Sequence, residues 1–461
     1  MNIPRIRILP AIALLLANIL LVTSPPRMEA QSPAPSPATA QKRDPFVKDA
    51  SPTPQPNPGP TKAISLAFTL EVYALSQDDA MQVLAESGTG EARHDAVLRL
   101  MNAGKARLET LMCSVGKSGQ RTVVEGVDEV RYPSVFGINL PDSPSGKYTP
   151  SPYVNTPGSG SFQTRNAGDT LEIEPTLDSD EKYCDVNMVM QRVHSPDFPI
   201  VTGDTEKPSS FTQPRFLTGK LTTEVTLKVG EAEFLGTLND SPPYTNEIGK
   251  PATADVRLAF GRIDATDLGS YGQAGDESSA PYIELQATFY SLDREAARQI
   301  LTAGFEGEAC YDAVKALADK GQAKLEHVAV IKTKSGQRAV VQEADELRYP
   351  TEYNDTTPSI FETRNAGFTW EVEPTIDASG SILDLNQVPQ FVTYEGYLQV
   401  NGSVPKIEPQ PLFMTQKVTA EVIARLGKET LVGTFGDPGD DGVNGRKDTG
   451  RTWFGFVKGT L

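Results

Sequence analysis

Several residue types are scarce in this chain, and each scarcity excludes a class of protein. The 461 residues include three cysteines, Cys113, Cys184 and Cys310. They are too few for a disulfide framework and lie in no metal-binding spacing, so we expect free thiols that are buried or half-buried. Basic residues are outnumbered, since the formal net charge is −17. Such an acidic chain lacks the basic face that binds phosphates, so we expect no nucleic-acid partner.

Long apolar runs are scarce as well. A mostly apolar run covers residues 11–22, and its 12 residues are too few to cross a bilayer as a stable helix. Arg5 and Arg7 precede this run, as in a secretory signal. We therefore assign residues 1–30 to a signal peptide and expect an exported protein.

The stretch after this leader is rich in proline. Eleven prolines lie between Pro25 and Pro60, among Ser, Ala, Thr and Gln. Such a composition cannot bury enough apolar area to offset chain entropy. It predicts a disordered linker over residues 31–62.

What the chain does contain is a long sequence written twice. Ser118-Gly119-Gln120-Arg121 returns 217 residues later, at 335–338. From Tyr73 to Pro133, 28 of 61 residues are identical to those 217 positions further on. This identity over an ungapped stretch indicates an internal duplication.

A second repeated block gives the size of the repeat. Phe162–Thr176 returns at 361–375, an offset of 199, because the first copy carries 18 additional residues in the Pro/Ser/Gly-rich stretch 134–161. A unit of about 200 residues is too long for a solenoid repeat and can bury its own core. We expect two tandem domains, copy one at 63–272 and copy two at 280–461.

The patterns within each copy predict its secondary structure. Alternating apolar residues from Ile64 to Val72 predict a strand, and Ser76 and Asp293 stand where helix N-caps are needed. Two helices are expected next. The rest reads as strands, with Lys117–Gln120 as a hairpin-type turn. We therefore predict an α+β fold: two tandem domains, each a mostly antiparallel sheet with two helices near its start.

This order of blocks resembles the secretin family, the outer-membrane channel proteins of bacterial type II and type III secretion. The motifs that carry the resemblance are Gly104-Lys105-Ala106 to Tyr132-Pro133, Gly168–Thr176 and Gly367–Thr375, Cys184–Asn187 and Leu383–Asn386, and Gln213–Leu238 and Gln410–Phe435. They cover nearly all of both copies. After Gly236 and Gly433 the chain lacks the family's closing Val-Pro and Ile-Pro segment. The resemblance therefore implies the sheet scaffold rather than the channel.

We find no reactive constellation. The histidines, His94, His194 and His327, lie in no metal or nucleophile motif and align with other residue types in the opposite copy. We assign no catalytic, cofactor-binding or metal-binding residue, expect no cofactor, and interpret the chain as non-enzymatic.

Two further patterns have a structural and a functional interpretation. Residues 437–448 place Asp437, Asp441, Gly442 and Asp448 at calcium-loop positions, but position 3 is a glycine, so we favour a solvated loop.

Arg165 and Arg364 stand beside Asn in both copies. They either contact a neighbouring subunit or pair within a turn with a carboxylate such as Glu172 or Glu371, and we favour the turn.

The resemblance implies a scaffold or component of a type II or type III secretion or pilus-type apparatus, in the periplasm or outer membrane of a Gram-negative-type bacterium. Its expected partners are proteins of the envelope, including further copies of itself or a true secretin, and it can associate with the outer membrane. The alternative is a soluble extracytoplasmic binding or surface-structural protein that reuses the fold. That alternative needs exposed aromatic residues in a groove, for which Trp370, Tyr394, Tyr397 and Trp453 are the candidates.

Overall fold

The computed structural model describes twelve ranges of the chain: residues 61–85, 88–133, 162–197, 200–202, 210–212, 214–238, 255–271, 280–304, 307–354, 357–398, 410–436 and 448–461. They belong to one compact unit, Lys48–Leu461. The predicted signal peptide, the loop at 134–161 and the calcium-like run at 437–445 lie outside the described residues, as does the predicted linker up to residue 60.

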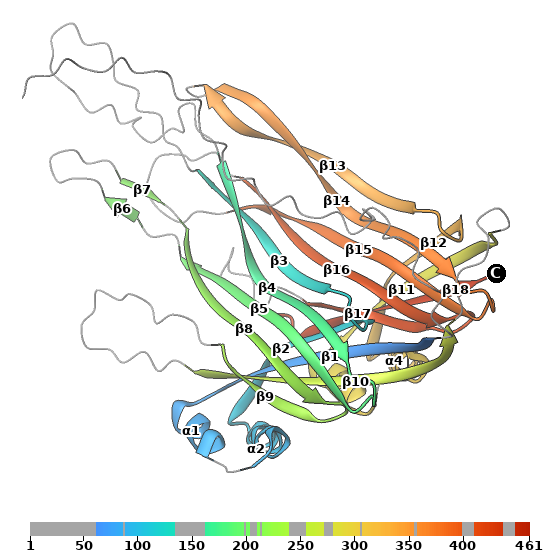
Figure 1. Cartoon of the computed structure of the whole chain (residues 1–461). Helices are drawn as coiled ribbons and strands as arrows, with labels where there is room; N and C mark the ends of the chain where they lie inside the picture. Colours follow the sequence, from blue (N-terminus) through green and yellow to red (C-terminus); the bar gives the residue numbers. More distant parts are fainter. Residues whose placement is uncertain are drawn as a thin grey trace, which may run out of the picture. The chain divides into compact units, whose positions relative to one another are not determined.

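Sheet A contains eight antiparallel strands, four from each copy, in the order β12-β11-β18-β17-β2-β1-β10-β9 (Figure 1). Copy two supplies β11 (Tyr282–Asp293), β12 (Ala323–Lys334), β17 (Thr430–Gly436) and β18 (Arg451–Thr460). Copy one supplies β1 (Thr61–Leu75), β2 (Ala106–Lys117), β9 (Ala232–Thr237) and β10 (Val256–Tyr271).

Sheet B is built in the same way, in the order β13-β14-β15-β16-β3-β4-β5-β8. Copy two supplies β13 (Ala339–Asn354), β14 (Thr357–Ile376), β15 (Ile382–Tyr397) and β16 (Pro411–Arg425). Copy one supplies β3 (Thr122–Pro133), β4 (Phe162–Leu177), β5 (Tyr183–Asp197) and β8 (Arg215–Lys228). A separate ribbon joins β6 (Ile200–Thr202) to β7 (Ser210–Thr212). Corresponding strands thus follow one another in the same order in both copies.

The two sheets pack against each other through their apolar faces. One core cluster joins residues of both sheets, with Phe68 and Phe289 from sheet A and Leu171 and Trp370 from sheet B. Phe289 and Phe391 meet edge to face across the two sheets, with ring centroids 4.9 Å apart. The period-2 patterns therefore bury one face of each strand against another sheet.

The predicted α+β class is wrong. The described residues are mostly strand, in two antiparallel eight-stranded sheets with four short helices: α1 (Gln77–Ala85), α2 (Gly90–Asn102), α3 (Arg294–Thr302) and α4 (Gly307–Asp319). These helices contact the strands of sheet A, whose other face packs on sheet B. A mostly β fold results because the second sheet, rather than the helices, covers most of the apolar face.

The predicted helix starts are confirmed. Asp293 caps α3, with its carboxylate accepting hydrogen bonds from the backbone N–H groups of Glu295 and Ala296. The Ser76 hydroxyl accepts the equivalent bond from Asp79 N at 3.1 Å. The N-terminal amides of a helix have no partner within the helix, so a side-chain oxygen at this position stabilises its first turn.

The predicted hairpin around Gly119 is wrong, although Gly119 has the expected positive φ, 77°. β2 and β3 follow one another but lie in different sheets, so the turn carries the chain from sheet A to sheet B. Gly119 N donates to Pro175 O, and Leu177 N donates to the Ser118 hydroxyl, at 2.7 and 2.9 Å.

The same corner recurs in copy two, where Gly336 N donates to Pro374 O and Ile376 N donates to Ser335. The repeated Ser-Gly-Gln-Arg and Glu-Pro-Thr motifs therefore hold each other in place. This contact gives both motifs a structural role.

Candidate functional site

The two copies join along a seam, which we define as the contact of β16 and β17 from copy two with β3 and β2 from copy one. In sheet B the ladder runs from Phe413 opposite Glu129 to Thr419 opposite Val123. Paired backbone groups thus make sheet B continuous from one copy to the other.

In sheet A the seam is short and close. Gly433 lies opposite Ser114, and Cys113 N donates to the Thr434 hydroxyl at 2.7 Å. The backbone of Gly126 also approaches Gly436, because a Cβ on Gly126 would lie 2.4 Å from the Gly436 carbonyl oxygen. The seam therefore requires glycine at position 126.

Lys117 carries the main charged contact of the seam. Its ammonium, on β2 of copy one, pairs with Glu421 and lies 2.9 Å from Asp384, both of copy two. Burial alone would lower the pKa of Lys117, but the two carboxylates outweigh it and the pKa is raised. Burial and the neighbouring Asp384 raise the pKa of Glu421 against the effect of Lys117. The lysine thus holds together two acids that would otherwise repel each other.

Arg364 makes a second charged contact across the seam. Its guanidinium pairs with Glu129 and donates to the Thr415 hydroxyl at 3.1 Å. The favoured turn interpretation of Arg364 is wrong, since the residue lies in β14 and Glu371 pairs instead with Arg338. Sequence reasoning found the residue but not its partner, which is distant in the chain.

Glu172, the carboxylate proposed to pair with Arg165, also pairs with a different residue. Glu172 pairs with Arg121, and Arg165 lies within β4 rather than in a turn. The turn interpretation is therefore wrong in copy one as well.

Each sheet ends on two outer strands. We call β12 and β13 of copy two the first edge, and β8 and β9 of copy one the last edge. In the described parts of the chain no further strand pairs with any of these four. Unpaired backbone N–H and C=O groups at such an edge can accept another strand.

The first edge also exposes apolar side chains. Leu325, Val328 and Val330 on β12 and Val340 on β13 are 43 to 52% exposed. Large apolar residues at this exposure on an unpaired edge are unusual, because proteins usually protect such edges with charge. The first edge is therefore the strongest candidate for an interaction surface.

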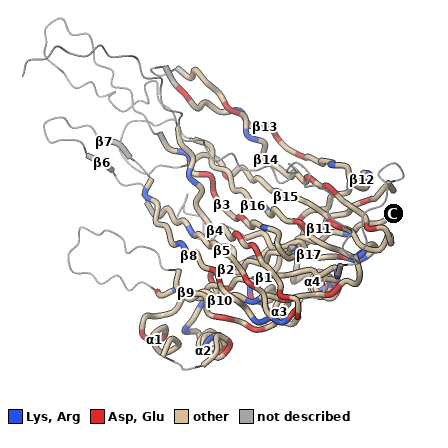
Figure 2. Tube along the Cα trace, in the orientation of Figure 1, with Lys and Arg blue, Asp and Glu red and all other residues tan. Residues whose placement is uncertain are grey.

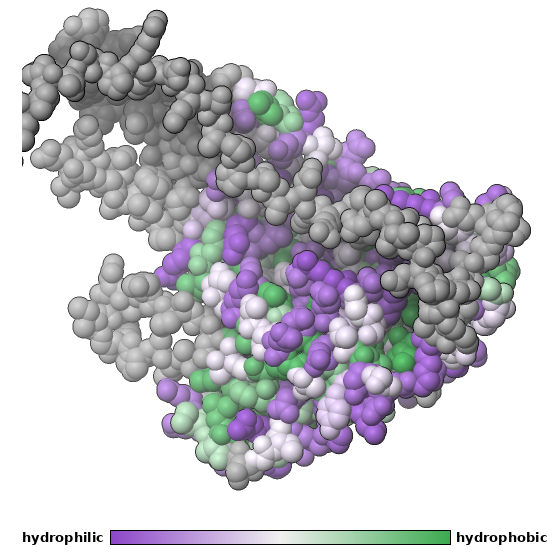
Figure 3. Space-filling view, in the orientation of Figure 1, coloured by the Kyte–Doolittle hydropathy of each residue, from purple (hydrophilic) through white to green (hydrophobic). Residues whose placement is uncertain are grey.

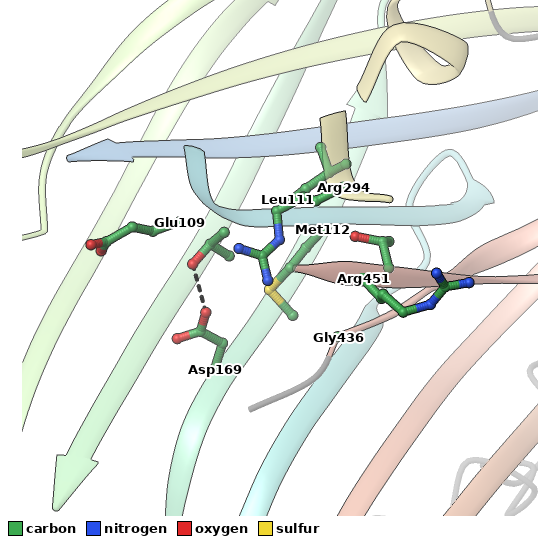
Figure 4. A pocket seen from close by; sticks show the side chains of 9 residues that line it. Glu109, Leu111, Met112, Asp169, Arg294, Gly436 and Arg451 are labelled. Atoms are coloured by element: carbon green, nitrogen blue, oxygen red, sulfur yellow. Dashed lines mark hydrogen bonds between the residues drawn. The ribbon is translucent and has the colours of Figure 1, made fainter. Parts of the chain in front are cut away.

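A buried charge cluster lies between the sheets of copy one. Glu109 accepts hydrogen bonds from Arg257 and Arg192, at 2.6 and 3.0 Å, and also pairs with Arg107. Thr110 donates to Asp169 at 2.7 Å, the bond drawn as a dashed line in Figure 4. The adjoining cavity is about 10 Å³, room for about one water. The cluster is thus too closed to admit a substrate.

The two carboxylates of this cluster differ. Burial would raise the pKa of Glu109, but Arg192 and Arg257 outweigh it and the pKa is lowered. Burial raises the pKa of Asp169, and Arg192 does not offset it. The corresponding positions of Thr110, Asp169 and Arg192 in copy two are aromatic: His327, Phe368 and Phe391, which pack together.

His94, His327 and the three cysteines lie in buried or packed surroundings within the described part of the chain. His94 lies 2.5 Å from Glu71, beside Tyr73, in a buried group, and His327 packs on Phe368. All three cysteines are free and buried, as predicted. Burial raises the pKa of the Cys113 thiol to about 12, which keeps it protonated and unreactive.

A larger hollow of about 420 Å³ lies between α3 and α4. Alanines, Ile300, Leu317 and Cys310 line much of it, and burial raises the pKa of the Cys310 thiol. Its lining is therefore mostly apolar, with Gln299 and Lys320 as its polar members. Within the described ranges, no three His, Cys, Asp or Glu side chains cluster as metal ligands.

The aromatic candidates for a binding groove do not gather at one place. Trp370 is fully buried, and Trp453 is half-buried against Phe391. Tyr394 and Tyr397 are exposed and pack edge to face. The structure thus brings two of the four together.

Of the four residues at calcium-loop positions, the structure describes Asp448. Its carboxylate pairs with Arg294. Asp437, Asp441 and Gly442 lie outside the described residues.

Charge and hydropathy are mixed over the described surface. Basic and acidic residues are both scattered along the strands (Figure 2), and hydrophilic and apolar residues are interspersed on the face seen in Figure 3. None of the helices in the described part of the chain has the length and apolar character needed to span a membrane.

Fold and surface together define a two-sheet β protein with an internal seam and two outer edges. No family model and no curated protein matches the chain. Among solved structures it is similar to the type II secretion system secretin GspD of E. coli K12, at 12% identity over 46% of this chain and 56% of that chain, with a TM-score of 0.22.

It is also similar to the V. cholerae type IV competence pilus secretin PilQ and to Aeromonas hydrophila ExeD. Both are 12% identical over 44% of this chain, covering 58% and 46% of theirs, with TM-scores of 0.21 and 0.20. The chain thus spans about half the length of these structures.

Proposed function

We propose that this chain is a non-enzymatic scaffold protein of the bacterial cell envelope, acting in a secretion or pilus-type apparatus and contacting other proteins through its sheet edges. The observation that carries the proposal is the first edge, where strands with one side unpaired in the described part of the chain carry exposed apolar side chains.

The sequence supports the setting. The leader predicts export, and the repeated motifs resemble those of secretins. The small size of the cavity beside Asp169 and the buried, protonated Cys113 thiol support a role without catalysis.

The test is fractionation of the native host, followed by identification of the proteins that co-purify with the chain. We expect recovery with the cell envelope, in a complex with proteins of an export or pilus apparatus. Each fraction is analysed with and without heating in detergent, which separates a stable multimer from loosely bound material. A resident periplasmic protein and a resident outer-membrane protein serve as fractionation controls.

Soluble recovery as a free monomer would contradict the proposal and favour the alternative, a soluble extracytoplasmic binding protein. The exposed Tyr394 and Tyr397 pair then becomes the place to search for a bound peptide or glycan.

A further inference from the structure

The seam joins two different sets of strands, and the two outer edges consist of the counterparts of these same two sets. At the seam, β16 and β17 of copy two meet β3 and β2 of copy one. The strands left outside are β13 and β12, the counterparts of β3 and β2, and β8 and β9, the counterparts of β16 and β17. The first edge of one chain and the last edge of another are therefore the same kinds of strand that already pair inside the chain.

The exposure of apolar side chains differs between the first edge and the equivalent strand at the seam. Val328 and Val330 on the first edge are 43% and 52% exposed, whereas their counterparts at the seam, Leu111 and Cys113, are 3% and 0% exposed. These side chains are therefore buried in copy one, which contributes its strand to the seam, and exposed in copy two, where the equivalent strand is an outer one. Covering such side chains stabilises a contact by roughly 25 cal/mol per Å² of apolar area.

Charge at the edges is complementary in the same register. Lys334 is the counterpart of Lys117 and is exposed on the first edge. Asp185 and Glu224 are the counterparts of Asp384 and Glu421, and both are exposed, Glu224 on the last edge and Asp185 on the adjacent strand β5. The lysine and the two acids are therefore present in both copies. Lys334 lies at one outer edge, and Asp185 and Glu224 lie at or beside the other, so they do not meet within one chain.

One position differs from the seam. Glu343 is the counterpart of Gly126, where the seam leaves no room for a Cβ. A contact in this register must therefore be looser near Glu343 than the seam is. We expect it to form after the chain has folded and to be weaker than the internal contact.

We propose that the first edge of one chain pairs with the last edge of a second copy, in the register of the seam, with Lys334 of one chain between Asp185 and Glu224 of the next. The inference deepens the proposed function and rests on it for the role of the edges. Because the two edges differ, each pairing leaves one edge of each kind open, and further copies add head to tail.

The register is tested by cross-linking. Thr434 lies across the seam from Cys113, so the proposed contact places Thr237 of one chain across from Val330 of the next. Cross-strand neighbours are close enough for a disulfide. The full chain carrying Thr237→Cys and Val330→Cys is purified in mild detergent, oxidised and run on a non-reducing gel.

We expect a ladder of multiples that collapses on reduction. The matched control replaces Thr237→Cys by Thr164→Cys, an exposed position on β4, an inner strand of sheet B, and should remain a single band. The native cysteines are buried and do not contribute. Absence of a ladder in the first variant, or an equal ladder in both, overturns the register.

The charged contact is tested by sedimentation of the full chain over a range of concentrations. Lys334→Glu is expected to weaken association at least tenfold, and mixing it with the Asp185→Lys/Glu224→Lys variant should restore mixed assemblies. Lys315→Glu, the same charge change on the exposed side of α4, should have no effect.

A monomeric wild-type chain at 100 µM, or association that is unaffected by Lys334→Glu, overturns the inference. Since these measurements use the purified chain, the inference can fail while the chain is still found in an envelope complex with other proteins. The proposed function would then stand with a different partner.

Discussion

Glu109 and Asp169 lie in the same buried cluster, yet their surroundings act on them in opposite directions. Glu109 accepts from three arginines, Arg107, Arg192 and Arg257, and its pKa is lowered although burial alone would raise it. Asp169 accepts from Thr110, and burial raises its pKa. A lowered carboxyl pKa means that the charged form stabilises the folded chain. A raised one means that the charged form costs stability.

This contrast predicts different effects of two conservative substitutions. Glu109→Gln removes the buried carboxylate that Arg107, Arg192 and Arg257 share and should lower the free energy of unfolding at pH 7 by about 3 kcal/mol. Asp169→Asn keeps an acceptor for Thr110 and removes a buried charge, so stability at pH 7 should be equal or higher. Urea unfolding of both variants measures the difference.

The pH dependence provides the control. The contribution of Glu109 is present above its unfolded pKa of about 4.3 and is lost as the pH falls through the lower folded value, so wild type and Glu109→Gln should converge in acid. For Asp169, stability is present below its unfolded pKa of about 3.9 and falls as the pH rises. Equal losses from both substitutions at pH 7 would contradict this assignment.

At the scale of single elements, helix α3 begins at a cap that can be removed. The Asp293 carboxylate accepts from two backbone N–H groups in the first turn. Asp293→Ala should therefore lower the free energy of unfolding by about 1 kcal/mol. Asp293→Ser, which retains an acceptor, should recover most of this loss in the same thermal unfolding measurement. A full loss with serine would show that the cap is not the cause.

The seam strands make a second prediction. Ala at position 126 would place its Cβ against the Gly436 carbonyl. Gly126→Ala should therefore cost about 1 to 3 kcal/mol, as overpacking does. Gly436→Ala is the matched control, since a Cβ there meets nothing within 4 Å. If both variants unfold at the same urea concentration, the close approach of the two backbones is not a constraint.

Elements differ in how far the sequence predicts them. The starts of α1 and α3 depend on residues within one turn, so Ser76 and Asp293 were sufficient to predict them. The period-2 patterns on either side of Gly119 predict strands but not their partners. Those partners lie far away in the chain, which is why a predicted hairpin is instead a crossing between sheets.

The same reason limits prediction of the site. Lys117, Asp384 and Glu421 have identical counterparts in the other copy, a signal that is present in the sequence. That Lys117 meets the acids of the other copy depends on the order of strands across the seam. Residue type and repetition were therefore available from the sequence, but the contact was not.

On the scale of the whole molecule, the seam couples the two copies. Sheets A and B both continue through it, and one core cluster contains residues of both copies. Neither copy can lose its structure without exposing the seam strands of the other. We therefore expect the two copies to unfold in one cooperative transition, with equal calorimetric and van't Hoff enthalpies.

Lys117→Met tests this coupling. The substitution leaves Asp384 and Glu421 close together without their cation and should lower the free energy of unfolding by about 1 to 3 kcal/mol, allowing for the partial exposure of the lysine. The matched control is Lys334→Met at the outer edge, which should change stability by less than about 0.5 kcal/mol in dilute protein. Scanning calorimetry distinguishes the outcomes. Two separate transitions in the wild-type chain, or equal effects of the two substitutions, would mean that the seam does not join the copies energetically.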